Sequence, residues 1–160
     1  MTPHDCCPDC GAVISGGREG CQAAWETITL RAYSEPAYGV LYDMAFDTYC
    51  MQHPEKYCRS TKSYAAHLTR LCCGLEYDGD TKVYAAIRRW LDGRVELEKS
   101  QLLAYRGKLT IADLLNAPAP QAYRQRILYW AEDVWAAYGS QHDLARSWIK
   151  AAMKSANYAI

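Results

Sequence analysis

The stretch AYGVLYDMAFDTYCMQH, residues 37–53, decides the fold class, because its apolar residues recur with the period of an α-helix. They are Val40, Leu41, Met44, Ala45 and Tyr49. Pro36 precedes the stretch and suits a first helical position, whereas Pro54 follows it and ends the helix. We therefore expect one helix over residues 37–53, with His53 at its C-terminal end.

The same period continues on both sides of this segment. It predicts further helices over residues 22–33, 63–77, 82–91, 110–116, 121–138 and 141–157. Asp78-Gly79-Asp80 and Asp92-Gly93 supply helix stops, and Thr110 with Asp113 resembles a capping box. Residues 11–20 and 54–63 are expected as loops, and residues 94–108 as a loop with some helix that ends in a turn at Arg106-Gly107.

No segment alternates with the period of a strand, and no internal repeat is present. The predicted fold is therefore all-α, a helical bundle with a cysteine-rich zinc-knuckle loop at its N-terminus. We expect a single domain over residues 1–160, in which the metal-binding loop of residues 1–21 packs on a helical body formed by residues 22–160.

Composition limits the functional classes. The chain has 160 residues, with eighteen basic and eighteen acidic side chains and no long run of either sign, which argues against a nucleic-acid partner. The N-terminus resembles no secretory signal, and no apolar stretch is long enough for a membrane span. We expect a cytoplasmic protein whose eight cysteines stay mostly reduced, where clustered thiols more often bind metal or perform redox work than form disulfides.

The N-terminal stretch CCPDCGAVISGGREGC, residues 6–21, carries the clearest chemistry. Cys7-Pro8-Asp9-Cys10-Gly11 has the C-x2-C-G form of a zinc knuckle, a tight turn that directs two thiolates to one point. Cys21 lies within reach through the glycine-rich loop and completes three sulfur ligands. A tetrahedral zinc site needs a fourth ligand, for which the candidates are His4, Cys6, Cys50, His53, Cys58, His67 and Cys72. We favour His53, because a helix end can project its side chain toward the N-terminal loop.

Two other uses of these thiols remain open. Cys7 and Cys10 form a C-x-x-C pair, but a thioredoxin-like redox site needs a βαβ context that this chain lacks. An iron–sulfur cluster would also need a fourth ligand. Zinc remains the favoured cofactor, since thiolate-rich sites select soft or borderline ions.

The order of several motifs resembles an uncharacterised family of small bacterial proteins. The motifs are CPDCG, the GC at residues 20–21, PAYG, FDTYCMQHP, SYAAHLTRLC, GKLTIADLLNA and VWAAYGSQH. The resemblance spans nearly the whole chain and implies motif positions at Cys7, Cys10, Cys21, Asp47, Gln52, His53, His67, Trp135 and His142. Tyr42 and Gln141 stand where the family pattern leads us to expect histidines. The family has no established activity to transfer.

An enzyme hypothesis follows from the histidines. If His53, His67 and His142 converge inside the bundle, they can hold a metal with an open position, with Asp47 or Glu76 as proton acceptor. Asp47, His67 and His142 are therefore the candidate catalytic residues. The alternative is that these histidines are core or capping residues and that Asp47 orients His53.

Three functional classes result. The favoured one is a small zinc-binding protein whose metal, held by Cys7, Cys10, Cys21 and His53, is mainly structural, and which binds a protein partner or a small ligand. The others are a metal-dependent hydrolase or transferase that uses the histidine cluster, and a thiol protein for metal handling or redox sensing. No motif identifies a substrate or an oligomeric state.

Overall fold

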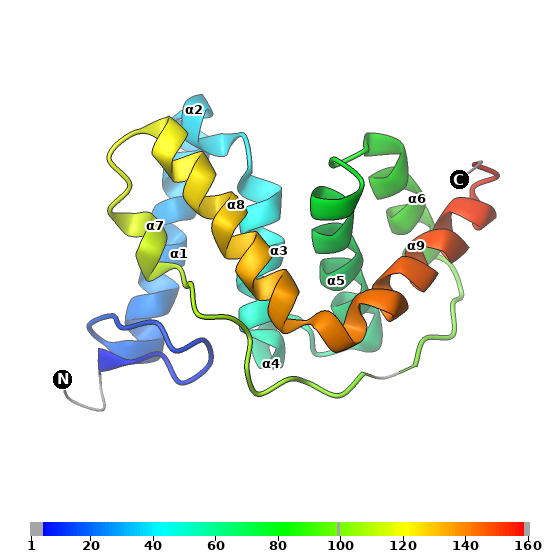
Figure 1. Cartoon of the computed structure of the whole chain (residues 1–160), viewed down its shortest axis with the longest axis horizontal. Coiled ribbons are helices and arrows are strands. Elements are labelled where there is room, and N and C mark those ends of the chain that lie inside the picture. Colours follow the sequence, from blue (N-terminus) through cyan, green and yellow to red (C-terminus); the bar gives the residue numbers. More distant parts are fainter. Residues whose placement is uncertain (1–4, 99, 159–160) are drawn as a thin grey trace.

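The computed structural model describes residues 5–98 and 100–158, and this part of the chain is helical (Figure 1). The helices are α1 Gly17–Ser34, α2 Pro36–Gly39, α3 Tyr42–Gln52, α4 Pro54–Tyr57, α5 Thr61–Glu76, α6 Thr81–Asp92, α7 Ala112–Leu115, α8 Pro120–Ala137, the 3₁₀ turn η2 Gly139–Gln141 and α9 His142–Ser155. Among the described residues no strand forms, and the nearest approach to one is an isolated antiparallel bridge between Cys6 and Val13. The predicted all-α bundle with an N-terminal cysteine-rich loop is confirmed.

Helix α3 lies at the centre of the arrangement. It packs on α5 on one side and on α8 on the other, and α5 in turn packs on α6 and α9. Figure 1 shows α1, α2, α7 and α8 on one side of the molecule, α5, α6 and α9 on the other, and a long loop that returns from α6 to α7 past one end of the bundle. The N-terminal loop lies at that same end, beside α1 and α4.

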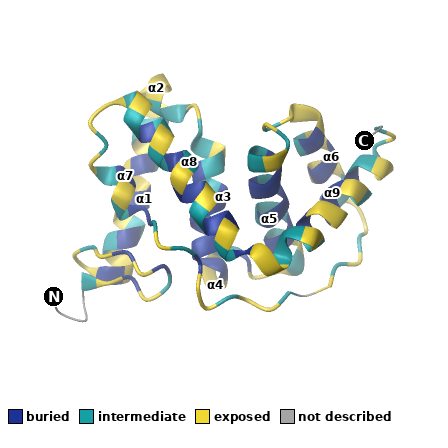
Figure 2. Ribbon diagram, viewed as in Figure 1, coloured by how far each residue is buried: buried dark blue, intermediate teal, exposed yellow. Residues whose placement is uncertain are grey.

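A continuous hydrophobic cluster runs from Cys7 in the N-terminal loop to Ala152 in α9. Its largest fully buried side chain is Trp130, and tyrosines such as Tyr49, Tyr123 and Tyr138 fill much of the remaining volume. Figure 2 shows the buried residues on the facing sides of the helices and the exposed ones outside. None of the helices formed by the described residues combines the length and apolar character that crossing a membrane requires.

The prediction of a single helix over residues 37–53 is wrong at its start. The chain forms α2, then a turn at Val40 and Leu41, and then α3. Gly39 allows this break. A Cβ at Gly39 would lie 2.7 Å from the backbone oxygen of Ala32 in α1, so only glycine lets α2 approach α1 this closely. The periodicity was correct for α3, but packing between α2 and α1 decided where that helix begins.

Other boundaries also differ from prediction. Residues 17–20, expected as loop, form the first turn of α1, and residues 54–57, also expected as loop, form α4. Helix α7, Ala112–Leu115, is shorter than the predicted 110–116. Only half of the expected capping box forms, in which the Thr110 N–H donates to Asp113 Oδ2 at 2.8 Å. The other half is missing, because the Asp113 N–H donates to the backbone oxygen of Thr110 at 3.0 Å and not to its side chain. The predicted stop after α5 is confirmed, since Asp78 and Gly79 both have positive φ and Asp80 caps α6.

Candidate metal centre

The knuckle is a tight turn closed by backbone hydrogen bonds. The Gly11 N–H donates to the Cys7 oxygen at 2.8 Å, and the Cys7 N–H donates to the Ala12 oxygen at 2.8 Å. Gly11 has a φ of 78°, a left-handed conformation that glycine adopts without a side-chain clash. The turn therefore places Cys7 and Cys10 on the same inner side of the loop, where both are buried.

The third sulfur comes from the start of α1. Cys21 lies one turn beyond Gly17, and its side chain is 1% exposed. The loop before the helix folds back onto it so closely that a Cβ at Gly20 would lie 1.9 Å from the backbone oxygen of Ser15. Gly20 is thus what allows the loop and the first turn of α1 to hold Cys21 beside the knuckle.

His53 ends α3 with its backbone outside the helical region, at φ −124° and ψ 49°. Its Nδ1 lies 2.8 Å from the backbone oxygen of Tyr49. Because a carbonyl oxygen only accepts, Nδ1 carries a proton, and Nε2 is the nitrogen that could bind a metal once it loses its own proton. Nε2 lies 3.4 Å from Cys21 Sγ and 3.7 Å from Cys7 Sγ.

The four candidate ligand atoms therefore converge. All of them, from Cys7, Cys10, Cys21 and His53, lie within 4.8 Å of one another, and Cys10 Sγ is 3.8 Å from Cys21 Sγ. All four residues are buried. This group of one imidazole and three thiols could hold a metal ion.

The close approach of the thiols changes their ionisation. Hydrogen bonds from Cys10 and Cys21 lower the pKa of Cys7, and the proton that Cys10 shares with Cys21 and Cys7 raises the pKa of Cys10. Burial would lower the pKa of His53, but its contacts with the Cys21 and Cys7 sulfurs outweigh burial and raise that pKa to about 9. The metal-free cluster thus favours a thiolate stabilised by neighbouring proton donors, a charge that a bound cation would neutralise.

Two arginines hold the knuckle in place. Arg18 on α1 forms a two-pronged ion pair with Asp9, with both contacts at 2.8 Å. Arg106, from the long loop, is only 8% exposed and donates from Nη1 to the backbone oxygens of Asp9 at 3.1 Å and of Gln52 at 3.2 Å. Its guanidinium also pairs with the Glu55 carboxylate. Arg106 therefore joins the knuckle to the residue that precedes His53.

Gln52 anchors the opposite face of the same segment. Its amide nitrogen donates to the backbone oxygens of Arg106 at 3.0 Å and Leu109 at 2.8 Å, and its side-chain oxygen accepts from Trp130 Nε1 at 3.0 Å. From the sequence, Arg106 was expected only in a turn with Gly107, without a role at the candidate metal centre. No motif indicates the role of Arg106, because its contact with the knuckle joins residues that are far apart along the chain.

The candidate catalytic residues Asp47 and His67 lie apart from the cysteines. Asp47 is 1% exposed; its Oδ1 accepts from His67 Nδ1 at 2.9 Å and its Oδ2 accepts from Arg70 Nε at 3.0 Å. Burial raises the pKa of Asp47, while His67 and Arg70 oppose that rise. Asp47 therefore links α3 to α5 through His67 and Arg70. It does not orient His53, which was one of the alternatives that the sequence left open.

His142 occupies a third location. Its ring stacks on Trp135 with 3.9 Å between centroids, and its Nε2 lies 2.8 Å from the Trp135 backbone oxygen. Trp135 Nε1 in turn donates to Glu76 at 3.0 Å, and Arg146 completes this group through an ion pair with Glu76. Within the described residues, the structure thus does not bring His53, His67 and His142 into one site.

The remaining candidates for the fourth ligand do not join the cluster. Cys6 is exposed, and its sulfur lies 3.4 Å from the Gly11 oxygen. Cys50, Cys58 and Cys72 are buried elsewhere in the helical body. His4 lies outside the described residues.

Comparisons with known proteins place the chain in a family without assigning it a role. No curated protein and no solved structure matches it. A family model matches residues 5–139, which include the knuckle, the four clustered candidate ligands, the Asp47 and His67 pair, and Trp135. The expected membership of an uncharacterised family is thereby confirmed: the chain belongs to DUF5946, a family of unknown function.

Proposed function

We propose that Cys7, Cys10, Cys21 and His53 bind one zinc ion in a closed tetrahedral site, and that this zinc is mainly structural. In this proposal the protein is a small, cytoplasmic, zinc-stabilised helical protein that binds a protein partner or a small ligand. The observation that carries the proposal is the convergence of three sulfurs and one imidazole nitrogen within 4.8 Å.

The distances within the cluster support zinc. A tetrahedron with zinc–sulfur bonds of about 2.3 Å and a zinc–nitrogen bond of about 2.0 Å has sulfur–sulfur edges of about 3.8 Å and sulfur–nitrogen edges of about 3.5 Å. The corresponding separations are 3.8 Å for Cys10 to Cys21, and 3.4 and 3.7 Å for the two contacts of His53. The donor set also disfavours calcium and magnesium, which take oxygen ligands.

Closure of the site supports a structural role. Four protein ligands fill a tetrahedral zinc ion, so no position is left for substrate or water. The ligands come from three segments, the knuckle, the start of α1 and the end of α3. A bound zinc would fasten the N-terminal loop to the helical body, and its binding free energy would add to the stability of the fold.

The two alternatives have less support. A metalloenzyme that uses the histidine cluster needs His53, His67 and His142 together, but His67 pairs with Asp47 and His142 stacks on Trp135. A metal-handling protein needs ligands that solvent and partners can reach, whereas the side chains of Cys7 and Cys21 are at most 1% exposed.

Elemental analysis of protein purified without a polyhistidine tag tests the proposal. We expect one zinc per chain in the wild type and in His67→Ala, and loss of zinc with a lower Tm in His53→Ala and Cys10→Ser. His67→Ala is the matched control, because it removes a histidine that contacts a carboxylate and not the cysteines.

Two results would contradict the proposal. One is retention of a full zinc equivalent and of full stability in both His53→Ala and Cys10→Ser. The other is loss of zinc from His67→Ala, which would move the metal to the bundle. Rapid removal of zinc by a chelator without unfolding of the helices would support metal handling instead.

A further inference from the structure

The surface is hollowed where α4 ends and α5 begins. A cavity of about 510 Å³ opens at this junction, and Ser100 and Leu102 of the long loop form its other wall. Figure 1 shows this loop passing the same end of α5. None of the four clustered metal ligands lines the cavity.

The N-terminus of α5 supplies hydrogen-bond donors to this cavity. Helix α5 has 16 residues, and its capping box uses Ser60 and Ser63 to satisfy the Ser63 N–H and the Ser60 N–H. The N–H groups of Thr61 and Lys62 donate to no acceptor within the described part of the chain. A helix N-terminus with free N–H groups and the positive end of the helix dipole attracts anions.

Tyr64, one turn into α5, provides an independent observation. It lines the inner wall of the cavity and is 3% exposed, and its hydroxyl has no hydrogen-bond partner. The nearby Ser100 hydroxyl lowers the pKa of Tyr64 slightly, against the larger effect of burial, but the two hydroxyls do not meet the geometry of a hydrogen bond. Burial raises the pKa of Tyr64 to about 12, so the hydroxyl keeps its proton and can donate. A buried hydroxyl left unpaired is costly, and a ligand that accepts from it would remove that cost.

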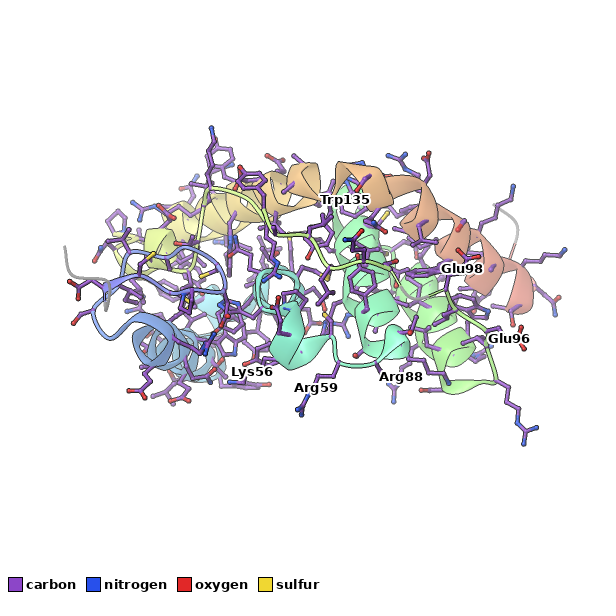
Figure 3. The ribbon with its side chains drawn as sticks, turned by 90° about the horizontal axis from the view of Figure 1, so that it is seen from below. Lys56, Arg59, Arg88, Glu96, Glu98 and Trp135 are labelled. Carbon is purple, nitrogen blue, oxygen red and sulfur yellow. The ribbon has the colours of Figure 1, made fainter. Side chains whose placement is uncertain are left out.

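The charges around the cavity also favour an anion. Arg59 lines it, makes no ion pair within the described residues, and extends into solvent from the α4–α5 junction (Figure 3). The one carboxylate among the described lining residues is Glu55, which Arg106 already neutralises. Cys58 stays a neutral thiol, because burial raises its pKa to about 12.

We propose that this cavity binds the phosphate group of a phosphate monoester, held by the free N–H groups at the start of α5, the Arg59 guanidinium and the Tyr64 hydroxyl. Donors on several sides match a tetrahedral oxyanion, which accepts from more directions than a planar carboxylate. The cavity is larger than a phosphate ion, and Pro54 and Leu102 provide an apolar wall for the attached organic group.

Isothermal titration of the full chain with phenyl phosphate, inorganic phosphate and acetate tests this site. We expect saturable binding of phenyl phosphate, with inorganic phosphate weaker and acetate weaker still. Arg59→Ala and Tyr64→Phe should each weaken the phosphate compounds at least about tenfold, because each removes a hydrogen bond to a charged group. If inorganic phosphate and phenyl phosphate bind equally well, the result would support a phosphate site but would identify free phosphate, and not a monoester, as its ligand.

Matched controls separate the site from general charge. Arg88→Ala removes an exposed arginine on α6, also labelled in Figure 3, and Tyr129→Phe removes an exposed tyrosine hydroxyl; both should bind as the wild type does. Tyr64→Phe should fold with unchanged or higher Tm, since it deletes an unpaired buried hydroxyl. The proposal is refuted if millimolar phosphate compounds do not bind, if acetate binds equally well, or if Arg59→Ala and Tyr64→Phe bind like the wild type.

Discussion

Arg106→Met should destabilise the protein more than any change to an exposed ion pair at the knuckle. Arg106 Nε donates to the Leu103 oxygen at 2.7 Å, and Nη1 donates to the oxygens of Asp9 and Gln52 at 3.1 and 3.2 Å. Both Nη atoms also contact the Glu55 carboxylate. Methionine can fill the volume of the arginine stem but replaces none of these donors.

The expected loss follows from these contacts. A hydrogen bond from a charged donor contributes about 1.5–3 kcal/mol when its loss strands a buried partner, and such losses are not additive. The Glu55 side chain is 54% exposed, so water can solvate it again, whereas the Gln52 oxygen stays buried. We therefore expect a loss of about 3–5 kcal/mol, because the backbone oxygens of Leu103, Asp9 and Gln52 each lose a charged donor and these losses do not simply add. For a chain of this size the Tm should fall by about 6–20 °C.

Urea and thermal unfolding followed by circular dichroism measure this loss, with Arg18→Met as the matched control. Arg18 also contacts Asp9, with two short contacts, but its side chain is 66% exposed and its ion pair should contribute little. If Arg18→Met lowers the free energy of unfolding as much as Arg106→Met or more, the reasoning is refuted. The exposed ion pair would then stabilise the fold more than the buried contacts of Arg106.

Two further predictions concern the loop before α1 and the hydrogen bonds that join Trp135, Glu76 and Arg146. Gly20→Ala should lower both Tm and zinc affinity, because the new Cβ would lie 1.9 Å from the Ser15 oxygen and displace Cys21. Gly139→Ala is the control, since its Cβ would meet nothing within 4 Å. Equal Tm values for the two variants would contradict this prediction. Hydrogen bonds from Arg146 and Trp135 lower the pKa of Glu76 below its ordinary value of 4.5, so its carboxylate stabilises the fold above pH 4.5 and loses that effect as the pH falls through the lower folded-state pKa. The Tm difference between wild type and Glu76→Gln should therefore shrink below pH 4.5, and a difference that stays constant from pH 6 to 3 would contradict the assignment.

Helices were predictable where local signals agreed. The stop at Asp78 and Gly79 was read correctly, because a positive φ and a following aspartate cap depend on neighbouring residues alone. The break between α2 and α3 was missed, since it depends on how closely Gly39 approaches Ala32 in another helix. The first turn of α1 was missed for a related reason: glycines at 16 and 17 read as loop, yet the helix begins at Gly17.

The candidate metal centre was predicted in part by spacing and in part by position. The C-x2-C-G turn and the nearby Cys21 form one group because few residues separate them along the chain. His53 was inferred from its place at a helix end, and the structure brings its Nε2 to the sulfurs. The supporting contacts of Arg106 and Gln52 join residues about fifty positions apart, for which the sequence contains no local signal.

By itself the sequence determined the helical class and the knuckle, since hydrophobic period, helix stops and cysteine spacing act over a few residues. Only the tertiary structure decided that His53 meets the cysteines while His67 pairs with Asp47 and His142 stacks on Trp135. It also decided that Tyr64 is left with a buried, unpaired hydroxyl at the start of α5. The physical reason is that such contacts depend on how the helices pack, and packing combines residues from distant parts of the chain.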